Sequence, residues 1–213
     1  MRELFEQELR DVTTEVIKMA QLVDQMLTDV IRSLQEKDLT LAKEIIIRDD
    51  VIDKIELEIE DQCVNIAARQ CPIARDLRRI NSILRMISDL ERIADHCVDI
   101  AKVVISNNGR EFVKPLIDLP RMQSICSEMI ADAIRSFINE DVEASREIIR
   151  RDDEVDAIYE RIYVELLNML TEDAYLKDQV VMLLLIGRYL ERIADHTTNV
   201  AERTIYMVTG YLK

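Results

Sequence analysis

Apolar residues recur every three or four positions along most of the chain, which is the spacing of one face of an α-helix. In the segment after residue 38, Ile45, Ile52, Ile59 and Cys63 fall on one side of a helical wheel. The chain has only 3 glycines and 3 prolines, so it offers few of the tight turns that a β-sheet protein needs. The pattern predicts an all-α protein.

The sequence also repeats itself. Residues 31–53 and 134–156 are similar at a constant offset of 103 residues, and the sequence LERIADH occurs at Leu90–His96 and again, 100 residues later, at Leu190–His196. A duplication of this length predicts two similar units that pack together. We expect a first repeat over residues 1–108, a linker over 109–120 and a second repeat over 121–213.

Each repeat is expected to contain three helices. Helix breaks are predicted near Lys37, Cys71, Glu140 and Asp173. Asp38 and Asp141 stand where a side chain would cap the helix that follows, and Pro72 suits the first turn of the third helix. The predicted fold is an elongated six-helix bundle made of two tandem three-helix repeats.

Charge and composition narrow the partners and the location. A formal net charge of -14 disfavours binding to nucleic acid or to anionic lipid. The sequence begins with charged residues rather than a secretory signal, and its longest apolar run, Val180 to Ile186, is seven residues against the roughly 20 that a membrane-spanning helix needs. The four cysteines lack a CxxC pair and are expected to be free thiols. We therefore expect a cytoplasmic protein without direct membrane insertion.

Acidic residues occur where the third helix should be apolar. With Leu84 at the centre of its apolar stripe, Glu91 and Asp95 fall roughly 20° to either side. The same stripe contains Leu77, Ile80, Ile87, Ala94 and Val98, and the solvent side carries Arg78, Arg85 and Arg92. Two carboxylates four residues apart repel each other, so a compensating cation or proton is required.

Four such acidic pairs occur, two in each repeat. They are Asp49 and Asp53, Glu91 and Asp95, Asp152 and Asp156, and Glu191 and Asp195. Asp99 extends the second pair, but its counterpart in the second repeat is Asn199. Paired oxygen ligands suit hard or borderline cations such as Fe, Mn, Mg or Ca.

The alternative to a metal is intramolecular ion pairing. The arginines considered for it are Arg48, Arg151, Arg188 and Arg192. His96 and His196 each follow an aspartate directly, and they could either orient a ligand or bind the ion themselves. Gly187 and Ala194 would let a neighbouring backbone approach the last helix closely.

No pattern of catalytic residues is present. The sequences GxxxxGK[ST], GxSxG and HExxH are absent, and neither histidine has a glutamate three residues before it, as a ferritin-like di-metal protein requires. The leading interpretation is a non-enzymatic regulator. A metal-free helical scaffold with a chaperone-like role and a ferritin-like di-metal carboxylate protein remain as alternatives.

The chain resembles the PhoU family of phosphate-signalling regulators. The resemblance lies in RDDVID at Arg48–Asp53, RDDEVD at Arg151–Asp156 and the two LERIADH sequences. It implies a cytoplasmic negative regulator of phosphate uptake that acts between the phosphate ABC transporter and a membrane sensor histidine kinase, associating peripherally with those complexes. It also implies one multinuclear cluster of Fe, Zn, Mn or Mg in each half. The first cluster would use Asp49, Asp53, Glu91 and Asp95, and the second Asp152, Asp156, Glu191 and Asp195.

We further expect a homodimer. Partner proteins would contact either the arginine row at Arg78, Arg85 and Arg92 or the acidic column formed by Asp49, Asp53, Glu56 and Glu60.

Overall fold

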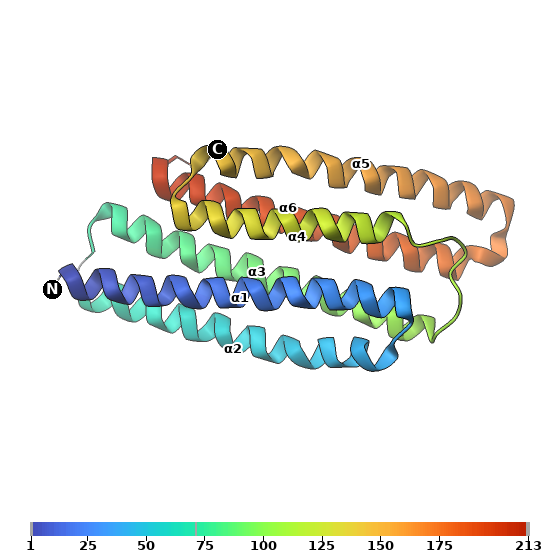
Figure 1. Cartoon of the computed structure of the whole chain (residues 1–213), viewed down its shortest axis with the longest axis horizontal. Coiled ribbons are helices and arrows are strands. Elements are labelled where there is room, and N and C mark those ends of the chain that lie inside the picture. Colours follow the sequence, from blue (N-terminus) through green and yellow to red (C-terminus); the bar gives the residue numbers. More distant parts are fainter. Residues whose placement is uncertain (1, 71, 212–213) are drawn as a thin grey trace.

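A computed structural model describes residues 2–70 and 72–211, and over these residues the chain forms six α-helices and no β-strand (Figure 1). The helices are α1 (Arg2–Glu36), α2 (Leu39–Gln70), α3 (Ala74–Asn107), α4 (Asp118–Asn139), α5 (Val142–Glu172) and α6 (Lys177–Thr209), with a short 3-10 helix, η1 (Ala174–Leu176), before α6. They all run along the long axis of the molecule. The prediction of an elongated six-helix bundle made of two three-helix repeats is confirmed.

Four helices form the centre of the bundle. Helix α1 packs against α3 and α4, and α6 packs against α3 and α4, so these four helices make a closed ring of contacts. Among the described residues, α2 contacts only α1 and α3, whereas α5 contacts α4, η1 and α6. Helices α2 and α5 therefore lie on opposite sides of the bundle, as Figure 1 shows.

The predicted helix caps are present at the start of α2 and α5. Asp38 accepts hydrogen bonds from the backbone N–H groups of Thr40 (2.9 Å) and Leu41 (3.0 Å), and Asp141 accepts one from Ala144 (3.0 Å). A capping side chain satisfies N–H groups that have no partner in the first turn of a helix. Each cap therefore begins the second helix of its repeat.

Two proline positions differ from the sequence-based expectation. The N-cap of α3 is Ile73, so Pro72 lies before the helix rather than in its first turn. Helix α4 begins at Asp118, which places Pro120 in its first turn, where a missing N–H costs nothing. The break expected at Cys71 falls on a residue outside the described part of the chain, between the end of α2 and the start of α3.

The apolar stripe of α2 is buried as predicted, but that of α3 is centred elsewhere. The predicted members Ile80, Ile87, Ala94 and Val98 are buried, but Leu77 is 48% exposed and Leu84 is half-buried. Ile83, Leu90 and Cys97, roughly 100–140° round the helix from Leu84, are fully buried as well. Helix α3 packs against α1, α2 and α6, so its buried arc is broad and faces the centre of the bundle. The acidic pair of this helix therefore lies at the edge of the core rather than in its middle.

The cysteines that the structure describes are buried free thiols. Cys63, Cys97 and Cys126 all lie in the core, and Cys71 is outside the described residues. Burial raises the pKa of the Cys97 and Cys126 thiols, which keeps them protonated and unreactive.

Candidate metal centres

The structure brings the predicted acidic pairs together in two places. Helix α2 packs against α3, and the Asp49 and Asp53 pair interacts electrostatically with the Glu91 and Asp95 pair. Helix α5 packs against α6, and the two pairs of the second repeat interact in the same way. We call these groups the first and second acidic clusters.

The carboxylates of the first acidic cluster raise one another's pKa values. Burial, and then the neighbouring Asp53 and Asp95 carboxylates, raise the pKa of Asp49 to about 6. Burial, and then Asp95, raise the pKa of Glu91 to about 7, although Arg92 opposes the shift. The cluster therefore takes up a proton or a cation more readily than isolated carboxylates do.

Glu56 is a further member of the first acidic cluster. It is half-buried on α2, and burial together with Glu60 and Asp53 raises its pKa. Glu56 also contributes to the raised pKa of Glu91 on α3. The sequence indicates this membership, because Glu56 is three residues after Asp53 on the same helix face. The expectation from sequence, however, places Glu56 in an acidic column that contacts partner proteins.

The second acidic cluster has the same arrangement. Burial, and then Asp156 and Asp195, raise the pKa of Asp152 to about 7. The pKa of Glu191 is also raised, by burial and then by Asp195. All four predicted ligands of this half therefore act on one another electrostatically.

Buried oxygen atoms without partners favour a cation at both clusters. Asp49 Oδ1, Asp152 Oδ1 and Glu191 Oε2 are buried and accept no hydrogen bond within the described part of the chain. Leaving such an atom unpaired costs free energy, and a hard metal ion bound to oxygen ligands would recover it. Among the described residues, no three acidic, cysteine or histidine side chains converge on one point as they would around a bound metal ion.

Three arginines partly neutralise the clusters, whereas Arg48 and Arg151 pair with other residues. Arg92 contacts Asp95 at 2.6 Å, Arg192 contacts Asp195 at 3.1 Å, and Arg188 donates a hydrogen bond to Glu191. The four aspartates Asp49, Asp53, Asp152 and Asp156 have no ion pair among the described residues. These aspartates of α2 and α5 are therefore influenced by Lys102 and Arg188 only at longer range, without a direct ion pair to a described residue.

Arg48 and Arg151 instead tie neighbouring helices together. Arg48 of α2 contacts the buried Asp29 of α1 at 2.6 Å, and Arg151 of α5 contacts Asp132 of α4 at 2.9 Å. These two ties are related by the 103-residue offset of the repeats. Each fixes its helix one residue before the first aspartate of an acidic cluster, so it positions that aspartate rather than neutralising it.

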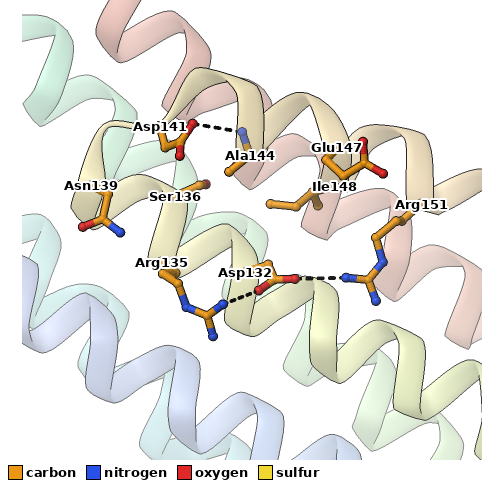
Figure 2. A pocket seen from close by; sticks show the side chains of 9 residues that line it. All are labelled: Asp132, Arg135, Ser136, Asn139, Asp141, Ala144, Glu147, Ile148 and Arg151. Carbon is orange, nitrogen blue, oxygen red and sulfur yellow. Dashed lines mark hydrogen bonds and ion pairs between the residues drawn. The ribbon is translucent and has the colours of Figure 1, made fainter.

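Figure 2 shows the second of these ties beside a cavity of about 230 Å³ between α4 and α5. Asp132 lies between Arg135 and Arg151 and contacts both, at 2.8 and 2.9 Å. Both arginine charges are therefore already paired, and Glu147 and Asp141 also line the cavity. None of the eight predicted metal ligands lines it, so the cavity is separate from the acidic clusters.

The two LERIADH histidines meet at the contact between the repeats. The rings of His96 and His196 are 5.6 Å apart between centroids, and His96 stacks on Tyr189 at 5.7 Å. His196 Nδ1 lies 3.0 Å from Asp89 Oδ1, which also accepts a hydrogen bond from Asn199 at 3.0 Å. Burial, and then the neighbouring His196, lower the pKa of His96, so its imidazole is neutral at pH 7. The histidines thus connect α3 with α6.

The arginine row on α3 is only partly on the solvent side. Arg85 and Arg92 are exposed, but Arg78 is half-buried and its side chain lies against Gly210 at the end of α6. The expectation that all three face solvent is wrong for Arg78, because the end of α6 covers that position.

None of the described helices is both long and apolar enough to span a membrane.

Comparison with known proteins identifies one family over both repeats. The family model for the PhoU domain matches residues 16–104 and 119–204. A Clostridium acetobutylicum protein named phosphate-specific transport system accessory protein PhoU homolog is 37% identical over 210 residues, which cover 98% of this chain and 96% of that protein. A Deinococcus radiodurans protein with the same name is 37% identical and covers 99% of both chains. The crystal structure of PhoU from Pseudomonas aeruginosa superposes with a TM-score of 0.93 at 33% identity, over 97% of this chain and 100% of that one.

Proposed function

The chain belongs to the PhoU family, and from this membership we propose that it is a metal-binding, cytoplasmic regulator of phosphate transport. In this role it represses the phosphate-uptake genes when phosphate is plentiful. It acts between the phosphate ABC transporter and a membrane sensor histidine kinase, as a homodimer and without enzymatic activity of its own.

One observation carries the proposal: the similarity covers both repeats and nearly the whole chain. The Clostridium acetobutylicum relative, named for its accessory role in phosphate-specific transport, matches 98% of this chain. Partial similarity would leave one repeat free for another role. Similarity over both repeats supports a shared role for the whole molecule.

The acidic clusters supply a physical basis for the metal-binding part of the proposal. Asp49, Asp53, Glu91 and Asp95 would hold one metal group between α2 and α3, and their second-repeat counterparts would hold another between α5 and α6. When bound, the cation supplies positive charge that neutralises the carboxylates. This chain's own contribution is to position the ligands through the Arg48–Asp29 and Arg151–Asp132 ties.

A metal-free scaffold is the second candidate, and the ion pairs of Arg92, Arg188 and Arg192 favour it. It accounts for Asp95, Asp195 and the Oε1 atom of Glu191. It does not account for the buried oxygen atoms of Asp49 and Asp152, which have no partner in the described part of the chain.

A genetic experiment tests the regulatory role. The gene is deleted in the source bacterium, in a strain without other PhoU-family genes, and transcription of the phosphate transporter genes is measured in phosphate-rich medium. We expect a several-fold rise in the deletion strain and normal repression when the wild-type gene is returned. Unchanged transcription in the deletion strain would contradict the proposal.

A biochemical experiment tests the partners. Purified chain is added to membrane vesicles that contain either the transporter or the sensor kinase, with vesicles lacking both as the control. Cosedimentation with the transporter and kinase vesicles only is the expected result, and equal binding to all three would argue against specific partners.

A further inference from the structure

Several acidic positions of the first repeat are neutral in the second, and three of them continue the faces that carry the first acidic cluster. Glu56 and Glu60 of α2 correspond to Tyr159 and Tyr163 of α5, at the 103-residue offset, and Asp99 corresponds to Asn199. Asp99 is already paired with Lys102 at 3.1 Å, so the difference rests mainly on the two glutamates. The first acidic cluster therefore has the more negative surroundings, which attract cations more strongly.

In the second repeat an aromatic ring occupies the place of Glu56. A Cβ atom at Gly187 would lie only 3.0 Å from the Tyr159 ring, so the absence of a side chain there lets the ring pack against α6. The equivalent residue in the first repeat is Ile87. The second acidic cluster thus has a tyrosine ring where the first has a carboxylate that can bind a cation.

The second repeat also has a cation hydrogen-bonded to the glutamate of its cluster. Arg188 donates a hydrogen bond to Glu191 and is the counterpart of Ser88, which is exposed and uncharged. Glu191 is only 13% exposed, so this pair is weakly screened by solvent. In the first repeat, the one ion pair of Glu91 with a described residue is to its sequence neighbour Arg92, at 3.4 Å.

We propose that the two acidic clusters differ in function: the first binds divalent cations tightly, whereas the second binds them weakly because Arg188 already neutralises Glu191. This inference rests on the metal-binding part of the proposed function. Any effect of a bound metal ion on the protein would then arise at the contact between α2 and α3. The second acidic cluster then serves mainly as an ion-paired contact between α5 and α6.

The two repeats allow an exchange of the residue that makes the difference. We compare the wild-type chain with Arg188→Ser, with Ser88→Arg and with the double exchange, all metal-free, by titration with Mn²⁺ and separately with Fe²⁺ under nitrogen. Binding is measured by calorimetry and, for Mn²⁺, by loss of the free-ion electron paramagnetic resonance signal. Asp49→Asn and Asp152→Asn assign each class of site to its repeat. Circular dichroism checks the fold of every variant; Ser88 is exposed and the Arg188 side chain is 40% exposed.

The expected result is a tight class of sites that Asp49→Asn weakens and Asp152→Asn leaves intact. Arg188→Ser should raise the affinity of the weak class about tenfold, and Ser88→Arg should lower that of the tight class by a similar factor, as expected for one charged hydrogen bond. Equal affinity of the two repeats, or no response to either exchange, would overturn the inference while leaving metal binding in place. If the wild-type chain binds neither ion, both the inference and the metal-binding part of the proposed function fail.

Discussion

Replacing Asp152 with asparagine should stabilise the metal-free chain. The Asp152 carboxylate is half-buried among Asp156, Asp195 and Glu191, which together with burial raise its pKa from 3.8 to about 7. Above pH 7 the folded chain must therefore hold a charge in an unfavourable place. Asparagine has nearly the same shape and no charge, so it removes this cost.

The size of the effect follows from the pKa shift. Each pKa unit corresponds to about 1.4 kcal/mol, so a shift of this size sets an upper limit of about 4 kcal/mol. Solvent screening of a half-buried group reduces this to about 1–2 kcal/mol. Because the folded pKa is raised, the stabilisation from protonated Asp152 is fully present below about pH 4 and is lost as the pH rises to about 7. The benefit of Asp152→Asn should therefore be larger at pH 8 than at pH 5.

Thermal unfolding followed by circular dichroism measures this effect. In chelator-treated protein at pH 8 we expect Asp152→Asn to raise Tm by roughly 2–8 °C. The control is Glu160→Gln, which removes an exposed carboxylate elsewhere on α5 and should change Tm little. A lower Tm for Asp152→Asn at pH 8, with the control unchanged, would show that the carboxylate makes a favourable contact and would refute the reasoning.

Three further predictions concern the helix ties, a close contact and metal removal. Asp29→Asn should lower the free energy of unfolding by about 2 kcal/mol and Asp132→Asn by about 1 kcal/mol in urea unfolding, because the Asp29 side chain is 4% exposed and that of Asp132 is 33% exposed; equal losses would contradict the role of burial. Gly187→Ala should be destabilising in the wild type but stabilising by about 1 kcal/mol in a Tyr159→Ser background, where the ring is gone; the same sign in both backgrounds would rule out the contact. Chelation of protein purified with its metal should lower Tm at pH 8, since it leaves the carboxylates unneutralised, and returning Mn²⁺ should restore it; an unchanged Tm would argue that ion pairs alone neutralise the clusters.

Helix content, the repeat and the helix ends were predictable from sequence because local chemistry sets them. Asp38 and Asp141 cap the helices that follow them whatever the tertiary packing, and a repeat is visible without any structure. The buried arc of α3 was not predictable, because it depends on α1, α2 and α6 packing around that helix. A single apolar stripe centred on Leu84 would suit a helix that packs against one neighbouring helix, whereas α3 packs against three.

The membership of the acidic clusters was partly predictable. Helical spacing placed each pair on one helix face, and the repeat linked the two halves. The directions of Arg48 and Arg151 were not predictable, since both reach α1 or α4 rather than the aspartate next to them in sequence. The contact of His196 with Asp89 depends on α3 meeting α6, and sequence spacing holds no sign of a contact between residues this far apart.

The most direct test of the metal-binding regulator is elemental analysis of the chain purified without chelator or affinity tag. It is compared with a variant in which Glu91, Asp95, Glu191 and Asp195 are all replaced by alanine, with circular dichroism as the control for folding. The account predicts at least one equivalent of metal in the wild-type chain and its loss from the folded variant. Wild-type protein that stays metal-free after reconstitution with iron, manganese, zinc and magnesium would contradict it.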